Sequence, residues 1–155
     1  MDTIAILNDA VGGVKVTVTD DFSAVDPDLP MGEVLLRGKQ AVTFVQTRWD
    51  VGDQTNTARL ERQKMYMNAF VRNLRTKMQN EPEFVFSTYV QIVDYIVTDC
   101  SPETLSRLEK DYGDYTAGEV ISLEGENVLG EELYEFYVDE DALDALILNL
   151  LYSTD

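Results

Sequence analysis

A chain of 155 residues is long enough for one domain with a sizeable core, and an apolar fraction of 45% indicates a globular protein. The formal net charge of −17 argues against nucleic acid as a partner, because most of the surface would repel a phosphate backbone. Histidine is absent, which excludes Ser-His and Cys-His nucleophile pairs and His-ligated metals. A metal would have to be a hard cation held by carboxylates, such as magnesium.

The first part of the chain predicts a helix, a strand and a loop. Apolar residues at helical spacing predict a helix over residues 3–10, and Gly12-Gly13 follows as a helix stop. Valines alternate with polar residues over 14–18, a pattern typical of a strand with one buried face. Residues 20–30 are rich in Asp and Pro and are interpreted as a solvated loop.

The central segment, residues 37–77, reverses the sign of the charge. It holds nine of the twelve basic residues and three acidic ones, a net charge of +6, whereas residues 1–36 carry −6 and residues 78–155 carry −17. Fixed positive charge in a cleft concentrates negative ligands, so this segment is the expected functional centre.

A helix is expected over residues 39–48 of this segment. Phe44 and Arg48 lie four residues apart on one apolar stripe, which also carries Ala41 and Val45. A buried arginine must pair or meet a ligand, because an unpaired buried charge is costly. A salt bridge and a bound anion are both compatible with this pattern.

After a polar turn, a longer helix is expected from near Asn56, with Thr55 or Asn56 as its N-cap. Arg59, Arg62 and Gln63 lie within its first two turns, next to the positive end of the helix, where their donors would suit phosphate or pyrophosphate oxygens. A solvated helix face is the alternative. The expected buried stripe is formed by Leu60, Met67, Val71, Leu74 and Met78.

The remainder of the chain predicts an α/β pattern within one domain over residues 1–155. The expected elements are a helix over 83–97, a helix from the Ser101 cap to Tyr112, strands over 119–123 and 133–138 separated by a Gly- and Glu-rich turn, and a last helix capped by Asp139. Cys100 is the only cysteine, so no intrachain disulfide is possible, and a passive buried thiol is expected. No apolar run reaches about 18 residues, so the chain as given is expected to be soluble.

Three motifs, in their order and spacing, resemble the LytR-CpsA-Psr family of cell-envelope proteins. DAVGGVKVTV (9–18) resembles the family's GGV strand, RGKQAVTFVQTR (37–48) its G-x-x-A-x-x-Y-x-R-x-R helix, and NTARLERQ (56–63) its R-x-x-R-Q helix. The ending is similar to the family's C-terminal strand and helix. The resemblance covers nearly the whole chain but only the C-terminal half of the family domain. It implies a mixed β-sheet packed by helices, without the N-terminal part of that domain.

The resemblance implies an enzyme that moves a glycopolymer from undecaprenyl pyrophosphate to peptidoglycan through a phosphodiester. By position, Arg48 and Arg59 would be catalytic, and Arg62, Gln63 and Gln46 would join them in binding the pyrophosphate. Gln46 stands where the family usually has the first arginine of its R-x-R pair, which removes one charge and keeps a donor. In phosphoryl transfer the protein mainly positions the reactants and neutralises the negative charge on the phosphate oxygens.

The resemblance also implies features that this chain does not carry. The family's N-terminal half holds magnesium with aspartates and follows a membrane anchor, so no metal ligand is expected here and the chain alone is expected to be inactive. The expected location is the extracytoplasmic side of the cell envelope, with polyprenyl-linked glycopolymer and peptidoglycan as partners. A non-catalytic module for polyprenyl phosphate or anionic wall polymer is the alternative. The family's older label, a transcriptional attenuator, has no basic helix-turn-helix here to support it.

Overall fold

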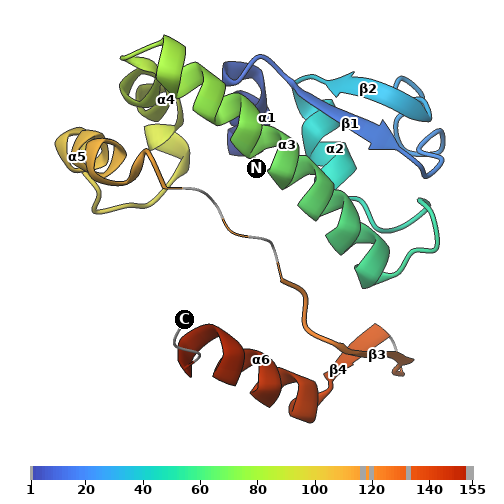
Figure 1. The fold of residues 1–155 in the computed structure, drawn as a ribbon. Helices are drawn as coiled ribbons and strands as arrows, with labels where there is room; N and C mark the ends of the chain where they lie inside the picture. Colours follow the sequence, from blue (N-terminus) through green and yellow to red (C-terminus); the bar gives the residue numbers. More distant parts are fainter. Residues whose placement is uncertain (1, 116–117, 119–120, 132–133, 153–155) are drawn as a thin grey trace. The chain divides into compact units, whose positions relative to one another are not determined.

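The computed structural model describes residues 2–115, 118, 121–131 and 134–152 (Figure 1). Its contacts divide the chain into two compact units, residues 1–116 and residues 117–155, which are described separately below as unit 1 and unit 2. Each unit combines helix with a two-stranded antiparallel sheet, so the predicted α/β class is confirmed. A single domain over residues 1–155 stays a prediction.

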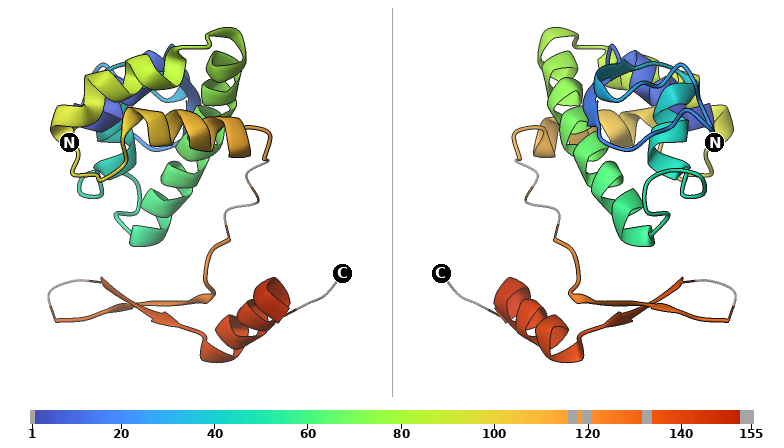
Figure 2. Two further views of the ribbon diagram at one scale, coloured as in Figure 1. Left: turned by 90° about the vertical axis from the view of Figure 1, so that its left-hand side faces the viewer. Right: turned by 90° about the vertical axis from the view of Figure 1, so that its right-hand side faces the viewer.

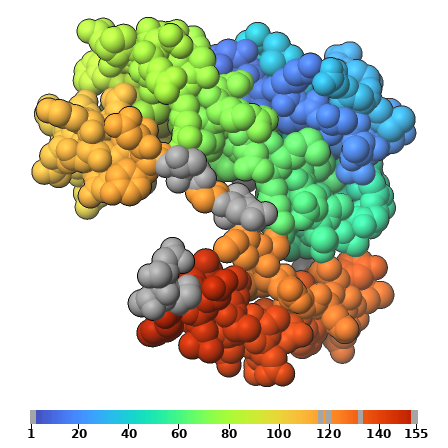
Figure 3. Space-filling model, in the orientation of Figure 1, coloured from blue at the N-terminus to red at the C-terminus, as the bar shows by residue number. Residues whose placement is uncertain are grey.

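Unit 1 is built around one long helix, α3, which packs against β1 and α2 (Figures 1 and 2). Helix α1 packs on α2 and α4, and α4 packs on α5. One side of α3 remains on the surface of the unit in the space-filling view (Figure 3). In chain order the elements are α1 (Asp2–Ala10), β1 (Val14–Val18), β2 (Gly32–Leu36), α2 (Lys39–Gln46), α3 (Asn56–Asn80), α4 (Phe84–Ile92), the 3₁₀ helix η1 (Val93–Tyr95) and α5 (Pro102–Tyr112).

Strand β1 confirms the predicted alternation, since its three valines are buried and Lys15 and Thr17 are exposed. Its partner β2 was not predicted. The pair is antiparallel, with Val14 opposite Leu36 and Val18 opposite Gly32. Only Leu36 of β2 is fully buried, and the sequence Val-Leu-Leu lacks the period of two that marks a half-buried strand.

The acidic loop between β1 and β2 is not simply solvated. Phe22 and Leu29 are 1% and 2% exposed and belong to the hydrophobic core. The Phe22 ring stacks on Phe44 of α2, with 5.9 Å between ring centroids. The loop is therefore anchored at both ends, and its acidic tip lies at the surface.

Helix α3 begins as predicted, because the Thr55 side chain accepts a hydrogen bond from the Ala58 amide at 3.1 Å. Its predicted stripe is wrong in the first half, where Leu60 and Met67 are 39% and 50% exposed. The buried residues of the helix are Arg62, Tyr66 and Ala69. Arg62 and Tyr66 are polar at their ends and form hydrogen bonds with buried partners. A search for apolar residues therefore could not identify the buried face of α3.

A buried polar cluster joins α1, β2 and α3. Asn8 is fully buried; its Nδ2 donates to the Leu36 carbonyl at 2.9 Å, and its Oδ1 accepts from the Tyr66 hydroxyl at 3.3 Å. The Asp9 carboxylate accepts from the Gly38 amide at 2.8 Å, directly before α2. Burial, and then the negative charge of Asp9, raise the pKa of Tyr66 to about 12.

This raised pKa predicts a loss of stability at high pH. The folded protein holds the Tyr66 proton more tightly than the unfolded chain, whose tyrosines have a pKa near 10.0. The stabilising contribution is therefore complete below pH 10 and disappears as the pH rises toward about 12. We expect the free energy of unfolding, measured with denaturant, to fall more steeply with pH above 10 in the wild type than in Tyr66→Phe. Equal slopes would contradict the assignment.

The predicted helix over 83–97 is shorter in the structure, because α4 ends at Ile92 and η1 ends at Tyr95. Helix α5 begins as predicted, with Pro102 in its first turn and the Ser101 side chain accepting from the Thr104 amide at 3.2 Å. Cys100, directly before this cap, is half-buried.

Unit 2 consists of β3 (Gly125–Leu129), β4 (Tyr134–Val138) and α6 (Glu140–Tyr152). The strands are antiparallel, with Gly125 opposite Val138. The strand predicted over 119–123 is wrong at 121–123, which have no regular structure, and 119–120 lie outside the described residues. Strand β3 occupies the expected turn instead; every residue in it is exposed, so it has no burial alternation to detect. Strand β4 and the Asp139 cap of α6 are confirmed.

Candidate anion-binding site

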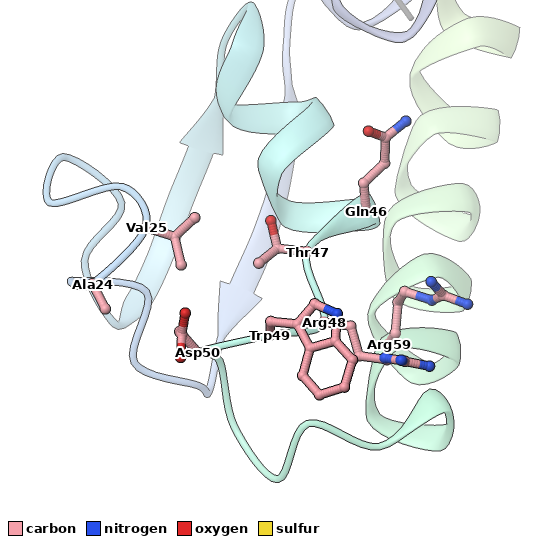
Figure 4. Close-up of a pocket in the computed structure, with 8 residues that line it drawn as sticks. All are labelled: Ala24, Val25, Gln46, Thr47, Arg48, Trp49, Asp50 and Arg59. Atoms are coloured by element: carbon pink, nitrogen blue, oxygen red, sulfur yellow. The ribbon is translucent and has the colours of Figure 1, made fainter. Parts of the chain in front are cut away.

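Unit 1 contains an open pocket of about 640 Å³ where three segments meet (Figure 4). The loop between β1 and β2 contributes one wall, the end of α2 and the residues after it contribute the centre, and the first turn of α3 contributes the other wall. The lining residues are Ala24, Val25, Gln46, Thr47, Arg48, Trp49, Asp50 and Arg59.

Three of the five predicted site residues border this pocket, namely Gln46, Arg48 and Arg59. They come from the end of α2, the residues after it and the start of α3, so the fold brings two separated motifs to one place. Arg62 and Gln63 do not line it. Their donors instead face the end of α2.

Arg48 is not on the buried stripe of α2, so that prediction is wrong. The helix ends at Gln46, and Thr47 is extended, which turns Arg48 out of the helical pattern. The Arg48 guanidinium lies over the Trp49 ring, 4.4 Å from the ring centroid. A cation over an aromatic face is attracted by the ring quadrupole, which helps to hold the side chain at the pocket.

Neither pocket arginine is neutralised by a carboxylate of the described residues. Within the part of the chain that the structure describes, neither Arg48 nor Arg59 forms an ion pair. Arg59 Nη2 donates to the neutral Asn56 side chain at 2.5 Å. The pocket therefore has two guanidinium groups beside the N-terminus of a 25-residue helix, where the helix dipole adds positive potential.

Arg62 is buried, with 4% of its surface exposed, and its guanidinium contacts groups of the protein itself. Its Nε donates to the Phe44 carbonyl at 3.2 Å, its Nη2 to the Thr47 carbonyl, and its Nη1 to the Asp20 carboxylate at 2.7 Å. Gln63 Nε2 donates to the Val45 carbonyl at 2.9 Å.

These carbonyls belong to the last turn of α2 and the residue after it, which have no further helical amide to accept from. Arg62 and Gln63 thus fix the backbone directly before Arg48. The direct contact of Arg62 and Gln63 with pyrophosphate stays a prediction; in this structure they position the residues that line the pocket.

The turn after Arg48 has a constrained backbone. Asp50 and Gln54 both have φ of 60°, a left-handed conformation that is uncommon outside glycine, and Gly52 has φ of 56°. Val51 between them is buried at 2% exposure. The Asp53 carboxylate accepts from the Thr55 amide and hydroxyl, and these bonds lower the pKa of Asp53 below its ordinary value.

Sequence reasoning missed five pocket residues: Thr47, Trp49, Asp50 and the loop residues Ala24 and Val25. A signal existed for Trp49, which is the only tryptophan of the chain and directly follows Arg48. No local signal marks Ala24 and Val25, because they reach the pocket only through the pairing of β1 with β2.

The magnesium ligands stay a prediction. Within the described residues, no group of three or more Asp, Glu, His or Cys side chains is arranged to hold a metal ion. Among the described helices, none combines the length and the apolar character that crossing a bilayer requires.

Comparison with known proteins gives one family. The sequence model of the LytR_cpsA_psr family matches residues 1–150. A comparison with curated protein sequences finds no match.

Several solved structures have a similar fold. A transcriptional regulator from Enterococcus faecalis aligns with a TM-score of 0.68 at 19% identity, over 91% of this chain and 51% of its own. TagV from B. subtilis aligns with a TM-score of 0.63 at 22% identity, over 99% and 62%. The Lin1025 protein from Listeria innocua aligns with a TM-score of 0.62 at 22% identity, over 94% and 63%. At these identities the likeness shows the fold, and the chain spans between half and two thirds of the length of these proteins.

Proposed function

The chain belongs to the LytR_cpsA_psr family, and from that premise we propose that it supplies the arginine side of a site that binds a polyprenyl pyrophosphate-linked glycopolymer for transfer to peptidoglycan. The observation that carries the proposal is the convergence of Arg48, Arg59 and Gln46 on one open pocket, with both guanidinium groups free of ion pairs in the described part of the chain. The proposed setting is the cell envelope, on the extracytoplasmic side of the membrane.

The proposed roles follow from the charges. Arg48 and Arg59 each present a planar fork of donors to diphosphate oxygens and neutralise charge there, the contribution that phosphoryl transfer needs most from a protein. Gln46 adds a neutral donor at the pocket wall. Magnesium, which the family activity implies, would add further charge neutralisation when bound. Its carboxylate ligands would come from outside the described residues.

Removing either pocket arginine is expected to weaken pyrophosphate binding by about 10- to 100-fold, the value of one charge-assisted hydrogen bond. Titration calorimetry with geranyl pyrophosphate would measure this in Arg48→Ala and Arg59→Ala. Arg72→Ala is the matched control, because Arg72 is an exposed arginine of α3, the helix that carries Arg59, and does not line the pocket. Wild-type affinity in both pocket variants would contradict the proposal.

The alternative function is a non-catalytic module that holds polyprenyl phosphate or anionic wall polymer in the same pocket. Assays of the complete protein, containing the rest of the family domain, separate the two functions. Transfer that disappears in Arg48→Ala and Arg59→Ala while the fold is retained supports the transferase. Tight binding with no turnover in the complete wild-type protein supports the module.

A further inference from the structure

Trp49 is an aromatic residue in the wall of the pocket, and it remains exposed although it contacts Arg48. The residue is 56% exposed although the Arg48 guanidinium covers one face of its ring at 4.4 Å. Ring surface that Arg48 does not cover is therefore open to solvent. An indole face of this size left open beside a binding site is available for a ligand ring to stack on.

Asp50 is an acidic residue in a pocket that otherwise favours anions. It lines the pocket next to Trp49, is exposed, and forms no ion pair within the described residues. Its charge opposes the binding of a diphosphate, and its left-handed φ of 60° is an unusual conformation for a residue with a side chain. A carboxylate at this place is suited to accept hydrogen bonds from neutral hydroxyl groups.

We propose that Trp49 and Asp50 form a sugar subsite beside the arginines, where the first sugar ring attached to the diphosphate stacks on the indole and donates hydroxyl hydrogen bonds to the carboxylate. This rests on the proposed function, because the diphosphate places the ring. The pocket then has a cationic part, Arg48 and Arg59, and a part for a neutral polyol.

The neighbouring residues favour a sugar over the lipid chain at this subsite. A polyprenyl tail gains affinity from enclosed apolar surface, whereas this pocket is open and has a carboxylate in its wall. A sugar ring has an apolar face for Trp49 and hydroxyl donors for Asp50 at its edge. The apolar Ala24 and Val25 lie on the loop at the opposite side of the pocket (Figure 4).

The test compares geranyl pyrophosphate with the same lipid diphosphate carrying one hexose, so that the ratio of the two affinities isolates the sugar. Trp49 is the only tryptophan, and its fluorescence therefore reports binding from within the pocket. Calorimetry supplies the affinities of the tryptophan variants. We expect the hexose to raise the affinity of the wild type about tenfold. Trp49→Ala should lose most of this gain, and Trp49→Phe, which keeps a ring, should recover part of it.

Asp50→Asn separates a ligand contact from a structural role. Asparagine tolerates the left-handed backbone, so the turn is retained while the charge is removed. The variant should bind geranyl pyrophosphate at least as tightly as the wild type, because a repulsive charge has gone, and should lose most of the hexose gain. A structural role alone would weaken both ligands together, and that result would overturn the proposal.

The remaining outcomes are also distinct. Wild-type binding of geranyl pyrophosphate with no gain from the hexose overturns the sugar subsite and leaves the proposed function standing. No binding of either ligand overturns both. Tighter binding of uridine diphosphate than of the hexose ligand would assign the aromatic ring to a nucleobase and overturn the sugar.

Discussion

Arg62→Met is expected to lower the free energy of unfolding of unit 1 by about 3–5 kcal/mol, the cost of removing one partner from a buried ion pair. The substitution keeps an unbranched side chain that reaches as far as the Nε position of arginine, and it removes every donor. It leaves the Asp20 carboxylate and the carbonyls of Phe44 and Thr47 without their partner. The Asp20 side chain is 23% exposed, so water can solvate the carboxylate in the variant and offset part of the lost free energy. The lower end of the range is therefore expected.

Denaturant unfolding followed by circular dichroism measures this effect, and Lys15→Met is the matched control. Lys15 forms an ion pair with Glu33 at 2.8 Å, but both side chains are mostly exposed, at 63% and 70%. Exposed pairs are worth about 0–1 kcal/mol, so the control should remain near the wild type. A loss below about 1 kcal/mol in Arg62→Met would contradict the burial and the hydrogen bonds assigned to Arg62.

Gly13→Ala is expected to destabilise unit 1 by about 1–3 kcal/mol more than Gly12→Ala. Both glycines have φ of +86°, so alanine pays the same backbone cost of about 1–2 kcal/mol at either position. They differ in the space around them. A Cβ on Gly12 meets nothing within 4 Å, whereas a Cβ on Gly13 would lie 2.9 Å from the Leu36 carbonyl oxygen.

This pair of variants isolates the steric part of the effect. The Leu36 oxygen also accepts the buried Asn8 hydrogen bond, so moving it disturbs the polar cluster between α1 and α3. The difference between the two free energies of unfolding is the quantity to measure. Equal destabilisation would show that β2 can move away from Gly13 without cost.

The helix boundaries that the sequence predicted well are those with local chemistry. Thr55, Ser101 and Asp139 are short polar residues that accept from amides of their own first turn, so their effect depends on a few neighbouring residues. Strands β2 and β3 were missed for the opposite reason. Each depends on a partner strand, and neither shows the alternation of buried and exposed residues by which β1 was found.

The candidate site was predicted in part. Charge reversal pointed to one segment, and three of the residues predicted there, Gln46, Arg48 and Arg59, share a pocket. Arg62 shows the limit of this reasoning, because a sequence shows that a residue is cationic but not whether a carboxylate from 42 positions away will meet it. The end of α2 shows another limit: Thr47 leaves the helix where the apolar spacing continues, which moves Arg48 from the core side to the pocket.

The loop between β1 and β2 has a consequence for how the pocket can change over evolution. Phe22 and Leu29 anchor its ends in the core, while Ala24 and Val25 lie between them at the surface and form one wall of the pocket. Substitutions or insertions at this tip leave both anchors in place. Such changes would alter the shape of that wall while the core of unit 1 and the two pocket arginines stay as they are.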